Sequence, residues 1–293
     1  MPQIQTILTH PGGAHKDELL ACSVLLAIHR VPLVRREPTA ADLADASVCV
    51  VDVGHVHDPA LNNFDHHQLP NDHPPTCALS LVLQHLHLYE EAREFCEWLE
   101  PAEWLDCRGP FATAEWLGVE RDILDKLNSP VDFTLLKRFA AISRLEPGEP
   151  LWEILRMIGE DILEYVKGLH ERLQILEDNV VFWAIPHAGA AVEVLFLPRT
   201  EPPLEDPSMG MDRFIARRGK VGVVGALVNP DRRGIGYGLS RFRDDPRFDF
   251  TRIAQQSDVH FAHARGFVAK TSATDVSRLK TLIEMALTPS SQA

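Results

Sequence analysis

The amino-acid sequence predicts an α/β protein in which a parallel-sheet domain, a long helical connector and a smaller α+β domain follow one another. Three observations support this. Strand-like and helical runs alternate near the N-terminus, a long amphipathic run comes after the middle of the chain, and β-rich runs separated by Pro, Gly and Asp follow it. A chain of 293 residues also exceeds what one core usually serves. We therefore expect a first domain at 1–127, a connector at 128–180 and a second domain at 181–293.

The first element is a short strand. Residues 3–9 (QIQTILT) form a strand-like run that ends at the turn His10-Pro-Gly-Gly. Asp17-Glu18 then opens the apolar stretch 19–29, which contains no Gly or Pro and is typical of a helix. The order strand, glycine loop and helix is that of a parallel α/β unit.

Two further strands complete the start of this sheet. Residues 34–36 indicate a second strand and residues 40–46 a short helix. The run SVCVVDVG at 47–54 is rich in β-branched residues and ends at a glycine, as a buried parallel strand does. Since ligands gather at the carboxyl ends of parallel strands, we expect His10 and Asp52 to lie at a site.

The remaining elements are helical first and then mainly strand-like. The pattern is helical at 75–127, and residues 151–179 predict one long amphipathic helix that packs on the first domain. A short helix at 275–287 closes the chain. Between them lie four strand-like runs, at 180–185, 190–197, 220–228 and 234–242.

Composition is that of a globular protein, with 45% hydrophobic and 24% charged residues. No apolar run approaches the roughly 18 residues of a membrane helix, and no signal-peptide pattern opens the chain, so we expect a cytoplasmic protein. The five cysteines form no CxxC pair, which favours reduced, mostly buried thiols.

Charge is distributed unevenly along the chain. Residues 1–180 contain 14 Lys/Arg and 30 Asp/Glu, whereas residues 181–293 contain 15 and 12. An acidic half suits divalent cations and a mildly basic half suits a phosphorylated substrate. The net charge of −13 argues against binding of extended duplex nucleic acid.

Four segments carry side chains that can bind metal: residues 10–18 (HPGGAHKDE), 51–54 (VDVG), 64–68 (FDHHQ) and 104–107 (WLDC). Ten of the 14 histidines lie within the first 87 residues. Imidazole and carboxylate ligands favour Mn²⁺ or a similar ion over structural zinc. Two such ions about 4 Å apart need a bridging carboxylate and further ligands on each side, and these segments contain enough of them.

These segments resemble the DHH phosphoesterase superfamily. The motifs THPGGAHKDELLA, VVDVG, FDHHQ and HFAHARGFVA are closer still to the family of metal-dependent protein hydrolases that includes the melanocyte proliferating protein. The resemblance extends from residue 7 to about residue 285. It implies a metal-binding catalytic domain at 1–127 and a substrate-binding domain at 181–293.

The resemblance implies two divalent metal ions, with Mn²⁺ favoured and Mg²⁺ or Co²⁺ as alternatives. His10 and His15 would bind one ion, and Asp52 would bridge the two. Asp17, His66 and Asp106 would bind the second ion. A water between the ions would then be the nucleophile.

Two neighbouring residues would have catalytic roles without binding metal. Asp65 would orient a histidine, and His67 would point at the substrate phosphate. This chain departs from the family pattern at Lys16, where a Cys or similar residue is usual. The fourth motif reads Asp106-Cys107-Arg108-Gly109 in place of Asp-Asn-Gly.

Substrate contacts are expected from arginines, whose planar fork donates two hydrogen bonds to a phosphate, and from a Gly/His-rich stretch. Residues 229–243 form an arginine-rich segment that contains Arg232, Arg233, Arg241 and Arg243. For each single arginine, a solvated surface position is the alternative. The candidates are Arg108, Arg232, Arg233, Arg241, His263 and Gly266.

The sequence therefore predicts a two-metal hydrolase that cuts phosphodiester bonds of short RNA or DNA, as a 3′–5′ exonuclease does. A phosphatase for small nucleotides, polyphosphate or pyrophosphate is the first alternative, and a catalytically silent metal-binding protein is the second. We expect a short oligonucleotide or a phosphorylated small molecule as substrate, and no membrane partner. Whether the chain forms a homodimer stays open. No GxSxG elbow, P-loop or dinucleotide-binding GxGxxG is present.

Overall fold

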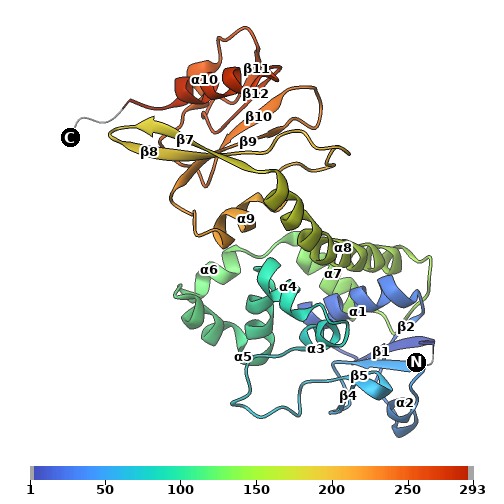
Figure 1. Cartoon of the computed structure of the whole chain (residues 1–293). Coiled ribbons are helices and arrows are strands. Elements are labelled where there is room, and N and C mark those ends of the chain that lie inside the picture. The colour runs from blue at the N-terminus through green and yellow to red at the C-terminus, as the bar shows by residue number, and fades with distance from the viewer. Residues whose placement is uncertain (1–2, 290–293) are drawn as a thin grey trace. The chain divides into compact units, whose positions relative to one another are not determined.

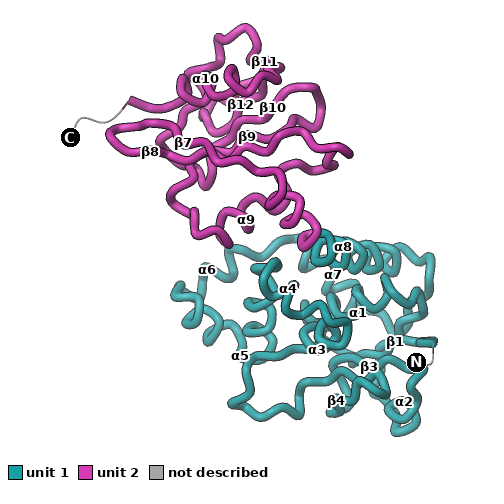
Figure 2. Tube along the Cα trace, viewed as in Figure 1, with its two compact units in different colours: residues 1–168 teal, residues 169–293 magenta. Residues whose placement is uncertain are grey.

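The computed structural model describes residues 3–289, and the chain divides into two compact units, residues 1–168 and 169–293 (Figure 2). Each unit has its own sheet and its own core, which confirms the predicted two-domain α/β fold. The division falls inside one long helix, α8 (Pro150–Asn179), so the segment expected to be a connector belongs partly to each unit. The expected domain boundaries stay a prediction.

The sheet of unit 1 is parallel at its centre and antiparallel at its edges (Figure 1). Its strand order is β4-β5-β3-β1-β2-β6. Because β1 and β3 are parallel neighbours, the residues that follow them lie at the same edge of the sheet. The strands are β1 (Thr6–Thr9), β2 (Leu33–Arg35), β3 (Val48–Val51), β4 (His57–Asp58), β5 (Asn63–Phe64) and β6 (Arg144–Leu145).

Helix α1 (Lys16–His29) lies in the core of unit 1, as its continuous apolar run predicts. It packs against α3 (Ala78–His85), whose apolar residues belong to the same core. It also meets α8 at Gly159, where an added Cβ would lie only 2.0 Å from the backbone oxygen of Ser23. This close approach holds the middle of α1 in place.

Helices fill the rest of unit 1, as predicted for residues 75–127. The helix α5 is broken at Gly109, whose φ is 74°, and it restarts at Pro110. The remaining helices are α2 (Ala40–Ala44), η1 (Pro59–Leu61), α4 (Tyr89–Phe95), α5 (Leu99–Leu117), α6 (Arg121–Lys126) and α7 (Pro130–Ala140).

Unit 2 has a mixed sheet in the order β11-β12-β10-β9-β8-β7, which is antiparallel except between β8 and β9. The four predicted strands and the closing helix are present. The short helix α9 and the strands β11 and β12 were not predicted. The elements are β7 (Val181–His187), β8 (Ala190–Phe196), α9 (Met211–Arg217), β9 (Val224–Pro230), β10 (Tyr237–Arg241), η2 (Phe250–Ile253), β11 (Val259–Ala262), β12 (Val268–Thr271) and α10 (Val276–Ala286).

Between residues 3 and 289, none of the helices combines the length and apolar character needed to cross a membrane.

Candidate metal centre

The six residues expected to bind metal converge at one edge of the unit 1 sheet. His10 follows β1, Asp52 follows β3, and His66 follows β5, so three parallel strands deliver them to the same edge. The loop after β1 leads into α1, whose N-terminal residues are His15, the helix cap, and Asp17 in the first turn. Asp106 comes from α5. The site is therefore built by the topology, from residues up to about 96 positions apart.

Asp52 has a left-handed backbone conformation, with φ 58°. Non-glycine residues adopt this conformation rarely, and it costs about 1 kcal/mol or more. Gly54, at φ 97°, continues the turn, and a Cβ there would come within 3.0 Å of Leu43. The tight turn leaves the Asp52 carboxylate buried and directed at the cluster.

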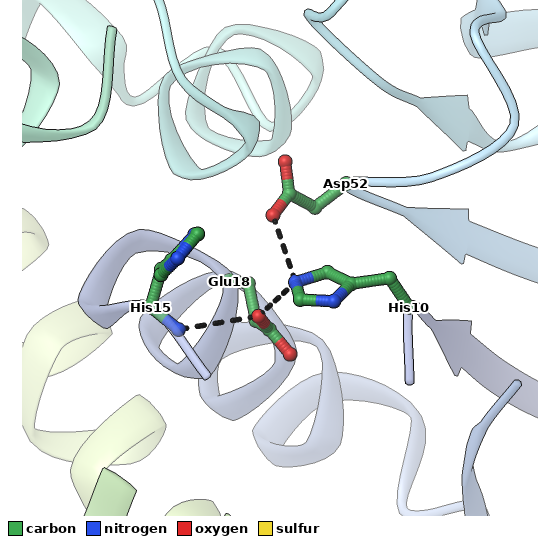
Figure 3. A group of neighbouring side chains, drawn as sticks. All are labelled: His10, His15, Glu18 and Asp52. Atoms are coloured by element: carbon green, nitrogen blue, oxygen red, sulfur yellow. Dashed lines mark hydrogen bonds and ion pairs between the residues drawn. The ribbon is translucent and has the colours of Figure 1, made fainter. Parts of the chain in front are cut away.

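The first group of converging side chains is His10, His15, Glu18 and Asp52, whose ligand atoms all lie within 4.8 Å of one another (Figure 3). Nδ1 of His10 lies 2.9 Å from the backbone oxygen of Pro11 and donates to it. Nε2 of His10 therefore faces the cluster, where it contacts Glu18 Oε2 and lies 3.5 Å from Asp52 Oδ2. This arrangement exposes one imidazole nitrogen to a metal ion and fixes the ring through the other.

The second group contains Asp17, His66 and Asp106. His66 Nε2 lies 3.1 Å from both Asp52 Oδ1 and Asp106 Oδ2, so Asp52 is shared with the first group. His15 Nδ1 is 3.6 Å from Asp106 Oδ1, and His15, Asp17 and Asp106 also have ligand atoms within 4.8 Å. The two groups thus form one continuous cluster.

Several buried polar atoms of this cluster have no hydrogen-bond partner within residues 3–289. Both carboxylate oxygens of Asp17 lack one, and His66 Nε2 forms none with Asp52 Oδ1 or Asp106 Oδ2 although it lies 3.1 Å from each of them. Leaving such atoms unpaired costs about 1–3 kcal/mol each, and more for charged groups. Cations placed among them satisfy all of these atoms together. The donor set of imidazole nitrogens and carboxylate oxygens fits borderline-hard divalent ions.

The pKa values show how closely these groups interact. The carboxylates of Asp52 and Glu18 raise the pKa of His10 to about 10. Burial lowers the pKa of His66, but contacts with Asp106 and Asp52 outweigh burial and raise it to about 12. Burial and the charges of Asp52 and Asp106 raise the pKa of Asp17 well above its usual range. Closely spaced carboxylates contribute to all three shifts, and a bound cation would relieve their mutual repulsion.

Asp65 and His67 form a pair beside the cluster. Asp65 is fully buried, and its Oδ1 lies 2.7 Å from Nδ1 of His67, which donates to it. The same carboxylate accepts hydrogen bonds from the backbone N–H groups of His67, at 3.0 Å, and His55, at 2.6 Å. The imidazole of His67 is half exposed, so its Nε2 is available on the open side of the site.

A small cavity of about 240 Å³ opens beside the cluster, with His66, His67 and Asp106 in its wall. Arg108 also lines it, and its Nη2 donates to the backbone oxygen of His73 at 2.5 Å. Arg108 therefore supports the loop 69–76 on the far side of the cavity, and its role in substrate binding stays a prediction.

Glu18 and Cys107 lie in two of the four segments expected to carry metal-binding side chains, but neither was predicted as a ligand, and Arg35 was not predicted to be near the site. Glu18 belongs to the first ligand group. Arg35 is buried and bonded to Glu18. Sγ of Cys107 lies 3.9 Å from Nδ1 of His66, and Cys107 forms a further group of possible ligands with His66 and Asp106. Adjacency to Asp17 and Asp106 was the only available signal for Glu18 and Cys107.

The expected substrate-binding residues of unit 2 separate into two places. Arg232 and Arg233 line a polar cavity of about 760 Å³, together with Asp231 and Lys270. Lys270 Nζ lies 2.7 Å from Asp231 Oδ1, so that carboxylate is already paired.

Arg241, Gly266 and His263 lie elsewhere in unit 2. A Cβ added to Gly266 would lie 3.1 Å from Arg241 Nη2 and 2.1 Å from Asp249 Oδ1. The ring of His263 packs on Phe267 at 4.0 Å between centroids. Arg243 is paired with Asp212 at 3.1 Å. The substrate roles of all these residues remain predictions.

One family of known proteins is similar to the first part of the chain. Residues 6–77 match the model of a family described as "Uncharacterised protein family (UPF0160)", with the short name MYG1_exonuc. A solved DHH domain, described as belonging to a member of a family of ribosomal proteins, is 15% identical, with 97% of this chain and 85% of that chain covered and a TM-score of 0.32. No curated protein matches. The segment similar to the first family contains five of the six expected metal ligands: His10, His15, Asp17, Asp52 and His66.

Proposed function

We propose that this protein is a metal-dependent phosphoesterase that hydrolyses phosphodiester bonds of short RNA or DNA with two Mn²⁺ ions. The observation that carries the proposal is the convergence of buried carboxylates and one imidazole from Asp17, Asp52, His66 and Asp106, with both oxygens of Asp17 lacking a hydrogen-bond partner. The similarity of residues 6–77 to a family with an exonuclease short name supports it further. Ions held there supply positive charge to a phosphate and lower the pKa of an attacking water.

The protein's own residues would act on the substrate from the open side of the centre. His67, held at Nδ1 by Asp65, presents Nε2 to the cavity. As a general acid it would donate from Nε2 to a phosphate oxygen or to the leaving oxygen. The buried position of Asp65 keeps the ring in one orientation during this step.

Cleavage at the end of a short chain agrees with the size of the cavity. Ligand pockets for whole small molecules usually measure about 300–1,000 Å³, and the cavity beside the centre measures about 240 Å³. It suits a phosphate and its sugar better than several nucleotides. The same observation keeps a small-nucleotide or pyrophosphate phosphatase as the second candidate.

Hydrolysis assays with Mn²⁺ on short oligoribonucleotides, a p-nitrophenyl phosphodiester and pyrophosphate test the proposal. We expect cleavage of the oligoribonucleotides and the diester, and loss of cleavage in Asp52→Asn. Cleavage of pyrophosphate alone would favour the second candidate. If no substrate is cleaved by protein that has bound Mn²⁺, the enzyme proposal is refuted and the silent metal-binding protein is favoured.

A further inference from the structure

Glu18 makes a different contact with each of its two carboxylate oxygens. It is completely buried in the first turn of α1. Its Oε1 accepts a hydrogen bond of 2.7 Å from Nη2 of Arg35. Its Oε2 contacts Nε2 of His10 and accepts a bond of 3.3 Å from the backbone N–H of His15. Glu18 therefore connects a buried arginine on one side with the metal centre on the other.

The contact between Glu18 and His10 needs a positive charge between the two side chains. Since Nδ1 of His10 donates to the oxygen of Pro11, neutral His10 presents a lone pair at Nε2. That lone pair faces Glu18 Oε2 and, at 3.5 Å, Asp52 Oδ2. Three electron-rich atoms directed at one point repel one another unless a proton or a metal ion lies among them. The nearby Asp17, buried with both oxygens unpartnered, points to metal ions at this place.

Arg35 fixes the position of the Glu18 carboxylate through a hydrogen bond. Its side chain is 1% exposed and lies over the ring of Phe139, 4.6 Å from the centroid. Besides Glu18, it donates to the backbone oxygens of Phe139 at 2.8 Å, Gly13 at 3.1 Å and Gly12 at 3.4 Å. Arg35 thus fixes both the Glu18 carboxylate and the glycine loop between His10 and His15. A lysine has no planar fork and cannot reproduce these contacts.

We propose that Glu18 is a further ligand of the metal centre, on the ion held by His10 and Asp52, and that Arg35 is its positioning residue. This inference rests on the metal centre of the proposed function, and it adds a carboxylate to the six expected ligands. Glu18 Oε2 binds the ion, and the guanidinium of Arg35 neutralises the remaining charge on Oε1. The ion binds the carboxylate in a single orientation because Arg35 allows no other.

The variant Glu18→Gln tests the ligand role. Arg35 only donates, so the amide oxygen of the glutamine would face it and the amide NH₂ would replace Oε2. The bond to Arg35 survives while the metal ligand becomes a donor. Titration calorimetry with Mn²⁺ should then show one ion bound about 100-fold more weakly or worse. The electronic absorption of the Co²⁺-loaded protein should change as well, since the ligand set differs.

Glu103→Gln is the matched control. Glu103 is also buried in unit 1, and its Oε1 accepts from Ser80 at 2.6 Å and Tyr89 at 2.8 Å. The same chemical change there should alter thermal stability and leave both Mn²⁺ affinities and the Co²⁺ absorption as in the parent protein. The variant Arg35→Lys tests the positioning role separately: every ligand stays, and one Mn²⁺ affinity should fall about 10-fold.

Three results separate this inference from the proposed function. Unchanged Mn²⁺ affinities and Co²⁺ absorption in Glu18→Gln overturn the ligand role and leave Glu18 as a residue that only caps the N-terminus of α1. Unchanged Mn²⁺ affinities in Arg35→Lys overturn the positioning role. If Glu18→Gln weakens metal binding but the parent protein cleaves no phosphoester, the ligand role is supported and the proposed function fails.

Discussion

The close contact between α1 and α8 predicts a large effect of adding one methyl group. In Gly159→Ala, the new Cβ would lie 2.0 Å from the oxygen of Ser23, 2.4 Å from its carbonyl carbon and 2.8 Å from the nitrogen of Val24. All three are backbone atoms of a helix, so no side chain can rotate away. Contacts are ordinary only above 3.4 Å, so the two helices must separate by about 1.4 Å at this point.

The size of this effect follows from two opposing contributions. Alanine is favoured over glycine inside a helix by about 1 kcal/mol. Forced overpacking of a core usually costs about 1–3 kcal/mol, and more where the backbone must move. Because the helix backbone must move here, the cost lies at the upper end of that range, and we expect a net loss of about 2 kcal/mol in the free energy of unfolding, or about 4–8 °C in Tm for a unit of this size.

Differential scanning calorimetry of two variants tests this reasoning. Gly168→Ala is the matched control, because Gly168 lies on the same helix and an added Cβ there meets nothing within 4 Å. It should raise Tm by about 2–4 °C. Mn²⁺ affinity should fall in Gly159→Ala, since α1 carries Asp17. A Tm for Gly159→Ala at or above that of the parent protein would show that the helices do not pack as described.

Further predictions concern protons and metal. Carboxylates raise the pKa of His10 to about 10, and they raise that of His66 to about 12 against the effect of burial. Binding of Mn²⁺ at pH 7 should therefore release protons. Calorimetry in two buffers of different ionisation enthalpy measures this release, and heats that do not depend on the buffer would contradict it. Both pKa values lie above the ordinary 6.5, so these two histidines should contribute their full stabilisation to the metal-free protein below pH 6.5. That contribution should fall as the pH rises through 10. A Tm constant between pH 7 and 10 would refute this. Chelation of Mn²⁺ present at 100 times its Kd should lower the free energy of unfolding by about 2.7 kcal/mol per site, measured by thermal shift. Asp65→Asn should lower kcat about 100-fold through His67 with unchanged metal content, and an unchanged kcat would remove this pair from the mechanism.

The sequence predicts the first sheet well because its signals are local. The strand-like runs 3–9 and 47–54 predict β1 and β3, and the apolar stretch 19–29 without Gly or Pro predicts α1, each within a few residues. The strands β11 and β12 escape prediction because the segment around His263 mixes single apolar and polar residues without a clear period. Their pairing with each other and with β10 stabilises them, and such long-range pairing leaves no trace in local sequence.

The site, like the fold, could be predicted only in part from the sequence. Histidines and aspartates that directly follow parallel strands can be assigned to one edge from the topology alone. The roles of Glu18 and Arg35 depend on their burial and on the contacts of the two Glu18 oxygens. The sequence does not show either, since most glutamates and arginines are exposed to solvent. The arginines of unit 2 form two separate groups because Arg232 and Arg233 lie in the turn between β9 and β10, whereas Arg241 lies at the far end of β10. Spacing along the chain does not contain that information.

The break in α5 has a consequence for how this protein tolerates changes in length. Each residue inserted into a continuous helix rotates everything beyond it by about 100°. An insertion between residues 99 and 105 would therefore turn Asp106 away from its partners. Because the helix restarts at Pro110, changes between residues 111 and 117 leave the orientation of Asp106 untouched. A change of length in the second half of α5 therefore disturbs the buried Thr113 and Ala114 and the stacking of Trp116 on Trp104, whereas a change in the first half disturbs the position of Asp106 itself.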